Sequence, residues 1–325
     1  MKALIVKTPG DQAVMEMATV PSPALGPGEV RIAVRASGVN RADLLQKRGL
    51  YPPPSGASDI LGLEVAGDVM QVGAGVKGFR EGDRVMALLP GGGYAEEACV
   101  DEGLVLPIDP RLDYAQGAAI PEAFLTAHHN LVTLGGLFPE SRILIHAGAS
   151  GVGTAGIQIA RGVAKEIWVT VGTPAKAHAV EQLGANAILY REKDFAEVIR
   201  REGWGKSVDL ILDPVGARYL ERNLSLLAIG GTLVLIAVMG GKECTIDLSL
   251  VLRHRLRIIG STLRNLPLAV KRAVVERFRR EQLAGFATRE LVPVVDKTYP
   301  ATQVEAAHAR MAENQNVGKL ILTWS

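Results

Sequence analysis

A glycine-rich segment, residues 146–154, contains the residue types in this sequence that best suit binding of a charged ligand. The apolar run before it predicts a strand at Ile143–Ala147, and the pattern after it predicts a helix at Val152–Val163. Glycines between a strand and a helix permit a tight turn and let the backbone approach a pyrophosphate, while the helix N-terminus offers free N–H groups to its charge. The segment therefore predicts a dinucleotide-binding site rather than a plain connector.

Two registers of the glycines are compatible with this prediction. Gly151, Gly153 and Gly156 match the spacing G-x-G-x-x-G literally. Gly148, Gly151 and Gly153 lie closer to the end of the predicted strand, and we prefer them for the turn. The residues expected to contact the dinucleotide are Gly148, Ala149, Ser150, Gly151, Val152 and Gly153.

The residues after the next predicted strand bear on which dinucleotide binds. An NAD site usually has an aspartate or glutamate about 20 residues after the glycines, where it binds the ribose. Residues 169–176 contain no acid, but they contain a hydroxyl at Thr173 and a cation at Lys176. A 2′-phosphate needs donors and positive charge, so this segment favours NADPH. The alternative is that Lys176 is a solvated helix residue.

The elements that would hold these residues alternate regularly from about residue 115. Predicted strands cover Ile143–Ala147, Glu166–Val171, Ala187–Leu189, Val208–Leu212 and Gly231–Val238. Predicted helices between them cover Val152–Val163, Ala175–Leu183, Phe195–Glu202 and Arg218–Leu227. Such alternation indicates βαβ units around a parallel sheet, whose strands are buried on both faces and therefore apolar throughout.

The N-terminal and C-terminal parts of the sequence show different residue patterns from this alternation. The first hundred residues contain short apolar runs separated by glycine, proline and aspartate, which predicts a mainly β domain. The C-terminal part combines a predicted amphipathic helix at Leu268–Leu283 with predicted strands at Val292–Val295 and Leu320–Thr323, and a helix from about Thr302 to Ala312. We expect this tail to return to the first domain.

Composition limits the classes of function. The chain has 325 residues, 48% of them hydrophobic and 22% charged, which is typical of a globular protein with more than one domain. A formal net charge of +2 gives no reason to expect a nucleic acid or a membrane as partner. Two cysteines cannot form a disulfide framework, and no targeting segment is visible at the N-terminus. We expect a cytoplasmic protein.

Several further motifs carry a family resemblance: Gly38–Asp43 (GVNRAD), Gly62–Gly67 (GLEVAG), Val72–Val85, the glycine segment with Gln158, and Asn316–Lys319 (NVGK). In this order and spacing, the sequence resembles the quinone oxidoreductase branch of the medium-chain dehydrogenase/reductase superfamily, the zeta-crystallin-like enzymes, over essentially its whole length. The resemblance implies an α/β protein with a GroES-like β domain (residues 1–120), a doubly wound Rossmann parallel-sheet domain (residues 121–262) and a returning C-terminal segment (residues 263–325).

The sequence departs from the zinc alcohol dehydrogenases of this superfamily. Those enzymes hold catalytic zinc with a cysteine near the position of Asn40, a histidine at the position of Leu63 and a third ligand near Glu122. Leucine cannot bind a metal, and one carboxylate alone cannot hold a catalytic zinc. The four-cysteine structural lobe is missing as well. We therefore expect no metal site.

Without zinc, hydrogen bonds must polarise the substrate. The resemblance implies that Asn40, Asp43 and Tyr51 lie beside the substrate, where Tyr51 would donate to a developing oxyanion and Asn40 would orient the substrate or the nicotinamide ribose. The alternative for Asp43 is a helix N-terminal charge, and for Tyr51 a loop aromatic packed on prolines. Further cofactor contacts implied by the resemblance are Thr126, Tyr190, Met239, Gly240, Arg264 and Asn316.

The expected function is hydride transfer from NADPH to a quinone or another conjugated carbonyl. Two alternatives stay open: an enoyl or alkenal reductase, and an NADPH-binding protein of the crystallin type without turnover. Relatives commonly form dimers through an edge strand, so we expect a homodimer or homotetramer. Leu233–Met239 or the segment Arg257–Thr262 would supply that edge.

Overall fold

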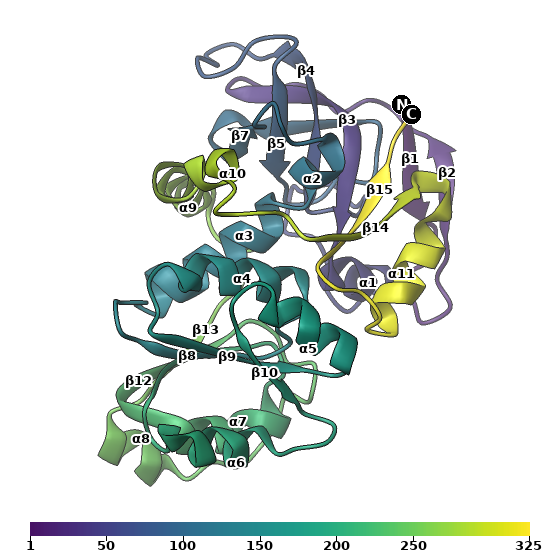
Figure 1. Cartoon of the computed structure of the whole chain (residues 1–325). Coiled ribbons are helices and arrows are strands. Elements are labelled where there is room, and N and C mark those ends of the chain that lie inside the picture. The colour runs from purple at the N-terminus through teal and green to yellow at the C-terminus, as the bar shows by residue number, and fades with distance from the viewer. The chain divides into compact units, whose positions relative to one another are not determined.

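The computed structural model describes all 325 residues and contains two compact units (Figure 1). The first unit combines residues 1–125 with residues 263–325, and the second comprises residues 126–262. The first boundary lies five residues beyond residue 120, where the sequence predicts it. Each unit has its own sheet, and the last segment of the chain belongs to the first unit.

The sheet of the first unit has seven strands. Its order is β14-β15-β3-β4-β5-β7, and β6 pairs with β3 on a separate branch. Because β15 lies antiparallel against β3, the C-terminal segment is built into the sheet rather than laid on it. A two-stranded hairpin, β1-β2, lies beside it. The strands are β1 (Lys2–Val6), β2 (Met15–Thr19), β3 (Glu29–Val39), β4 (Glu64–Val72), β5 (Arg84–Leu88), β6 (Glu97–Asp101), β7 (Val105–Pro107), β14 (Val295–Pro300) and β15 (Lys319–Thr323).

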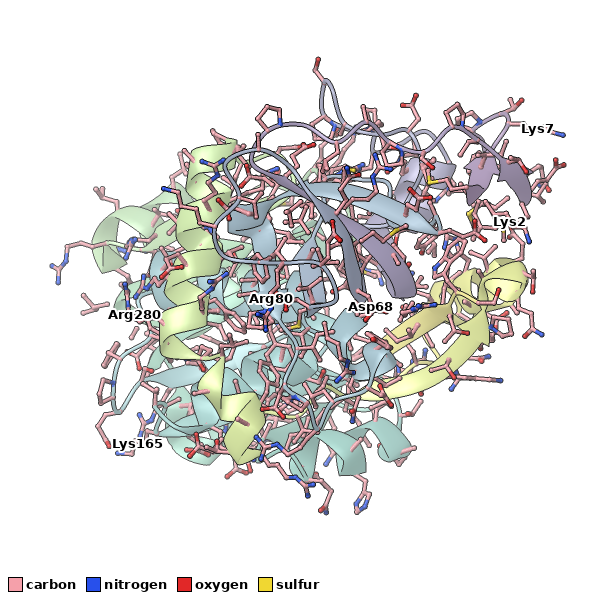
Figure 2. All side chains as sticks on the ribbon, turned by 90° about the horizontal axis from the view of Figure 1, so that it is seen from above. Lys2, Lys7, Asp68, Arg80, Lys165 and Arg280 are labelled. Atoms are coloured by element: carbon pink, nitrogen blue, oxygen red, sulfur yellow. The ribbon has the colours of Figure 1, made fainter.

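The helices of this unit are short apart from α9. Helix α9 buries Val274, Val275 and Phe278 on one side, and Arg280 projects from its outer side (Figure 2). The basic residues of this helix therefore differ in environment, because Lys271 is buried and donates to the Arg264 carbonyl at 3.2 Å. The helices are α1 (Arg41–Lys47), η1 (Glu102–Leu104), α2 (Tyr114–Ala118), α3 (Pro121–His128, which continues into the second unit), α9 (Leu268–Glu281), α10 (Ala284–Thr288), η4 (Ala301–Gln303) and α11 (Val304–Ala312).

The sheet of the second unit has six parallel strands, in the order β10-β9-β8-β11-β12-β13. The chain runs outward from β8 through β9 to β10, and then resumes on the other side of β8 with β11. The strand order therefore reverses between β8 and β11, which is the doubly wound arrangement that the sequence predicts. The strands are β8 (Arg142–Ile145), β9 (Glu166–Val171), β10 (Asn186–Leu189), β11 (Val208–Asp213), β12 (Leu227–Leu235) and β13 (Arg257–Gly260).

Helices cover both faces of this parallel sheet. Helices α4 and α5 lie on one face, and α6, α7 and α8 lie on the other (Figure 1). Two apolar cores result, one on each face, built from buried strand residues such as Ile145 and Leu212 on one side and Ile211 and Leu233 on the other. The helices are η2 (His129–Leu134, a π-helix), α4 (Gly151–Arg161), α5 (Pro174–Glu181), α6 (Phe195–Ile199), η3 (Arg200–Trp204, a π-helix), α7 (Ala217–Leu226) and α8 (Leu248–His254).

Two predicted strands are wrong in position. The strand predicted at Val292–Val295 is β14, which begins at Val295 and runs to Pro300 through mainly polar residues. It pairs only with β15, so it needs no continuous apolar run. The strand predicted at Gly231–Val238 is β12, which begins four residues earlier and ends at Leu235. None of the helices is both long enough and apolar enough to cross a membrane.

Candidate functional site

The glycine segment lies at the point where the strand order of the parallel sheet reverses. Strand β8 ends at Ile145, and α4 begins at Gly151, so residues 146–150 form the turn between them. Its neighbour β11 pairs with β8, and the loops after these two strands leave the carboxyl edge of the sheet side by side. In open α/β sheets this is the place where ligands bind.

Close packing requires glycine at two of the predicted positions. A Cβ at Gly148 would lie 2.5 Å from the Cβ of Val169, and a Cβ at Gly153 would lie 2.5 Å from the carbonyl oxygens of Ala147 and Gly148. The Ser150 hydroxyl caps α4 by accepting the Gly153 N–H at 3.0 Å. Since Gly153 belongs to both registers, it is the close contact at Gly148 that favours the register Gly148, Gly151 and Gly153.

The other two predicted residues of the loop differ in environment. Ala149 is buried and packs into the apolar core, so only its backbone is available to a ligand. Val152 is partly buried in the first turn of α4 and packs against the same core. These two positions therefore shape the turn, and a phosphate at the N-terminus of α4 would be bound by backbone N–H groups.

Two cationic side chains follow β9 and β10, Lys176 and Arg191, and we call them the cationic edge. Thr173 is the N-cap of α5, and Lys176 lies one turn into that helix. Tyr190, which is 41% exposed, follows β10 and approaches Gly172: a Cβ at Gly172 would lie 3.2 Å from the Tyr190 hydroxyl and 3.5 Å from Nε of Arg191. Sequence reasoning missed Arg191. The structure therefore brings two cations and two hydroxyls to the part of the sheet where the second ribose of a dinucleotide would lie.

Met239 and Gly240 lie beyond the carboxyl end of β12, in a loop tied to the loop after β11. The N–H of Met239 donates to the Pro214 carbonyl at 3.1 Å, and the N–H of Gly240 donates to the Val215 carbonyl at 2.7 Å. A Cβ at Gly240 would lie 2.7 Å from Cγ1 of Val215. All predicted cofactor residues between 148 and 240 thus gather at one edge of one sheet.

Thr126 is the first residue of the second unit, and its hydroxyl oxygen is buried without a hydrogen-bond partner. An unpartnered buried hydroxyl costs free energy unless a bound group completes it. Together with the glycine turn, which has no room for a side chain at Gly148, this orphaned hydroxyl is compatible with a bound dinucleotide.

A buried polar cluster occupies the first unit, at the start of β4 and β15. The Glu64 carboxylate is 0% exposed. It forms an ion pair with Lys319 at 2.6 Å and accepts hydrogen bonds from the Asn40 amide at 3.0 Å and from the Glu122 backbone N–H at 2.7 Å. Lys319 also donates to the Asn40 side-chain oxygen at 2.6 Å. Asn40 is therefore held on both sides by charged groups that the sequence prediction did not include.

Glu122 stands out in this cluster because its side chain makes no ion pair of its own. Burial, and next the nearby Glu64 carboxylate, raise the pKa of Glu122 to about 8, while Lys319 opposes the rise. At neutral pH the Glu122 carboxyl group is therefore protonated in most molecules. It is partly exposed, so it is available to a ligand as a hydrogen-bond donor.

Asp43 is fully buried, and hydrogen bonds within the first unit occupy both its oxygens. One oxygen accepts the Gly62 N–H at 3.1 Å, and the other accepts the Asn40 N–H at 2.7 Å and the Tyr94 hydroxyl at 3.1 Å. Burial raises the pKa of Asp43 to about 6, although these hydrogen bonds and Lys319 lower it. Asp43 thus anchors the start of α1 and the backbone of Asn40, which matches the alternative of a helix N-terminal charge.

Tyr51 and Arg264 form a pair. The guanidinium lies 5.3 Å from the centre of the Tyr51 ring and also donates to the Pro90 carbonyl and the Gln46 side chain, at 2.7 and 2.8 Å. Arg264 is only 4% exposed, so in this structure it supports Tyr51. Burial raises the pKa of the Tyr51 phenol, although Arg264 lowers it. The phenol therefore keeps its proton at neutral pH.

Asn316, the last predicted cofactor contact, lies in the first unit and is 8% exposed. Its amide donates to the Gly318 carbonyl at 2.7 Å. Gly318 has φ +77°, and a Cβ there would lie 2.2 Å from the Val294 carbonyl oxygen. Asn316 therefore supports the turn that delivers Lys319 to Glu64, and its contact with a cofactor stays a prediction.

The donor set does not suit zinc. Leu63 is 1% exposed and apolar, and the Asn40 amide is engaged by Glu64 and Lys319. No group of three or more histidine, cysteine, aspartate or glutamate side chains is arranged to hold a metal ion. The residues at these positions therefore do not fit a catalytic zinc.

Some functional candidates were absent from the predicted site, namely Glu64, Glu122, Lys319 and Arg191. A signal for two of them exists in the sequence: Glu64 and Lys319 are charged residues at the first position of apolar strand runs. A charge that enters a buried strand needs a partner. The sequence alone does not indicate that these two are each other's partner.

Two family models match the chain. The alcohol dehydrogenase GroES-like domain matches residues 26–110, and the zinc-binding dehydrogenase model matches residues 151–280. Together they cover about two thirds of the sequence. The GroES-like N-terminal domain and the α/β fold that the sequence predicts are thereby confirmed.

Known proteins similar to the chain include proteins of polyketide synthesis and quinone oxidoreductases. The spectinabilin polyketide synthase system protein NorB of Streptomyces orinoci is 35% identical over 300 residues, which are 92% of this chain but only 13% of NorB. The CurK enoyl reductase structure is 28% identical, with a TM-score of 0.85 and coverage of 99% and 98% of the two chains. The Escherichia coli quinone oxidoreductase structure, in complex with NADPH, is 27% identical, with a TM-score of 0.87 and coverage of 99% of each chain.

Proposed function

The chain belongs to the medium-chain dehydrogenase/reductase superfamily, and from that premise we propose that it is an NADPH-dependent reductase of quinones or other conjugated carbonyls. The observation that carries the proposal is the carboxyl edge of the parallel sheet. There a glycine turn with no room for a side chain at Gly148 lies beside a cationic edge made by Lys176 and Arg191. The NADPH complex of the similar quinone oxidoreductase supports the same cofactor.

Charge selects between the two nicotinamide cofactors. NADPH carries a 2′-phosphate, which would gain charge-assisted hydrogen bonds from Lys176 and Arg191. Thr173 and Tyr190 add hydroxyl donors at the same edge. NADH has a ribose hydroxyl at that position, and residues 172–176 contain no carboxylate to accept its hydrogen bond.

The bound cofactor would supply a hydride, and the reduced substrate needs one proton in addition. Tyr51 would donate a hydrogen bond to the substrate oxygen that gains negative charge, because its phenol keeps its proton. Glu122 would provide the proton, since its raised pKa leaves it protonated at neutral pH. Asn40 would orient the substrate, while Lys319 and Glu64 fix its amide.

Turnover assays test the proposal. Purified protein is given NADPH with a panel of small quinones and, separately, a panel of alkenals, in the presence of a metal chelator. We expect oxidation of NADPH with quinones and no loss of rate from the chelator. Tight NADPH binding without turnover on either panel would instead support the crystallin-like alternative. Absence of NADPH binding would refute the proposal.

A second candidate function has specific support. CurK is described as an enoyl reductase, and NorB belongs to a polyketide synthase system, so reduction of an activated carbon–carbon double bond is the competing activity. The two reactions share the hydride and the proton and differ in the atom that receives each. A rate on alkenals at least tenfold above the rate on quinones would favour this candidate.

A further inference from the structure

Four polar side chains lie buried behind the carboxyl edge of the parallel sheet, none more than 1% exposed: Thr170, His146, Asn223 and Asp213. They come from β9, the residue after β8, helix α7 and the end of β11. Polar groups in such positions cost free energy unless each has a hydrogen-bond partner. All four are joined in one sequence of contacts, which we call the buried hydrogen-bond chain.

The direction of each hydrogen bond in this chain can be assigned. The Asn223 amide nitrogen donates to Asp213 at 3.0 Å, so its oxygen must accept from Nε2 of His146 at 2.8 Å. Burial lowers the pKa of His146 to about 4, so the ring is neutral and its other nitrogen, Nδ1, is an acceptor. The Thr170 hydroxyl therefore donates to Nδ1 at 3.0 Å, and its oxygen accepts the Ala147 N–H at 3.3 Å.

At one end of the buried hydrogen-bond chain lies a strained backbone. Ala147 has φ +54°, a left-handed conformation that is unfavourable for a residue with a side chain. It directly precedes Gly148, whose N–H donates to the Thr170 carbonyl at 3.0 Å. Thr170 thus fixes two residues of the glycine turn, Ala147 through its hydroxyl and Gly148 through its backbone carbonyl.

At the other end of the buried hydrogen-bond chain lies the loop after β11. Asp213 accepts the N–H groups of Val215 and Gly216 at 2.6 and 3.2 Å. Val215 in turn accepts from Gly240, in the loop after β12. A continuous series of hydrogen bonds therefore links the glycine turn to the segment that carries Met239 and Gly240.

We propose that the buried hydrogen-bond chain positions these two loops relative to each other, so that cofactor affinity depends on side chains that do not touch the cofactor. Thr170, His146 and Asn223 are accordingly positioning residues. The identity of the ligand as NADPH rests on the proposed function, whereas the coupling between the loops does not. Because every donor has one acceptor, removing any single hydroxyl or amide leaves a buried group unpaired at each side of the break.

Thr170 offers a matched pair of variants. Thr170→Val removes the hydroxyl at nearly constant volume, and Thr170→Ser retains it. We expect Thr170→Val to weaken NADPH binding by roughly tenfold and Thr170→Ser by less than about threefold, because only the valine leaves Ala147 and His146 without their partner. Fluorescence titration of NADPH measures both.

A second substitution separates positioning from general loss of stability. Glycine adopts positive φ without steric cost, so Ala147→Gly in the Thr170→Val background should restore most of the lost NADPH affinity. The melting temperature should stay lowered, because His146 still lacks its donor. A merely structural role predicts that affinity and melting temperature move together in both variants.

Hydrogen–deuterium exchange on the cofactor-free protein tests the coupling by itself. Thr170→Val should speed exchange at residues 147–148 and also at residues 215–216, which lie at the far end of the buried hydrogen-bond chain. Thr170→Ser should leave exchange at both places unchanged. Faster exchange confined to residues 147–148, or unchanged NADPH affinity in Thr170→Val, would overturn the proposal. If the unmodified protein does not bind NADPH, the proposed function fails, and the exchange experiment alone decides on the coupling.

Discussion

At the scale of a single residue, we expect Lys176 to decide between NADPH and NADH. A charge-assisted hydrogen bond to a 2′-phosphate is worth roughly 1.5–3 kcal/mol, and each 1.4 kcal/mol is about tenfold in affinity. We therefore expect Lys176→Ala to weaken NADPH binding by roughly one to two orders of magnitude and to leave NADH binding nearly unchanged. Both dissociation constants should be measured at one salt concentration. Lys165→Ala, which removes an exposed lysine of the same unit paired with Glu140, is the control. An equal loss for both cofactors would indicate damage to the fold instead.

Glu122 makes a contribution to stability whose size depends on pH. Its pKa in the folded protein, about 8, lies above the ordinary value of 4.5. Its stabilising contribution is therefore complete below pH 4.5 and is lost as the pH rises through 8, because the folded protein disfavours the ionised form. Glu122→Gln cannot ionise. The free energy of unfolding of this variant, minus that of the unmodified protein, should therefore rise by roughly 2–4 kcal/mol as the pH goes from 5 to 9.

Denaturant unfolding at several pH values measures this difference, and an ordinary exposed carboxylate provides the control. Glu197→Gln should show no pH-dependent gain, because Glu197 is exposed on α6. A constant difference between Glu122→Gln and the unmodified protein across this range would show that Glu122 ionises normally in the folded state.

At the scale of elements, the turn into α4 depends on Gly153. An alanine there would place its Cβ 2.5 Å from two backbone carbonyl oxygens, which no side-chain movement can relieve. We expect Gly153→Ala to displace the turn, to lower NADPH affinity by at least tenfold and to destabilise the protein by about 1–3 kcal/mol. Gly162→Ala, after the other end of the same helix, is the control. Its Cβ would meet nothing within 4 Å, so it should leave both quantities nearly unchanged.

The elements also show what sequence patterns can and cannot predict. The parallel strands were predicted within a few residues because burial on both faces makes them continuously apolar, as in Glu166–Val171, which is β9. The edge strand β14 was misplaced because one neighbour suffices to hold a polar segment. The glycine turn was predicted from local spacing. The contact of Glu64 with Lys319 was not, because it joins residues from distant parts of the chain through sheet pairing.

At the scale of the whole molecule, we propose that two copies associate through the edge of the parallel sheet. Of the two predicted segments, Leu233–Met239 cannot supply this edge, because its strand residues belong to β12, which is paired with both β11 and β13. Strand β13, within Arg257–Thr262, has an open edge. Helix α8, which packs against β12, exposes Leu248 and Leu252 at 69% and 80%. Such exposed leucines are typical of a buried interface.

Sedimentation of the unmodified protein should show a dimer or tetramer. Leu252→Glu should shift the population toward monomer, because association would bury the new charge without a partner. Leu50→Glu alters a leucine that is also exposed, at 62%, but lies in the first unit, and should have no effect. A strictly monomeric unmodified protein would contradict this assembly.

The pairing of β15 with β3 also has a consequence for biosynthesis. The second unit is one uninterrupted stretch, residues 126–262, and can fold as soon as that stretch has left the ribosome. The first unit begins earlier but must wait, because β15, the strand that joins β3 to β14, is made last. Until then the Glu64 carboxylate, destined for a site with 0% exposure, lacks the ammonium of Lys319. A nascent chain stalled before residue 319 should therefore resist protease within residues 126–262 and remain cleavable in residues 1–125.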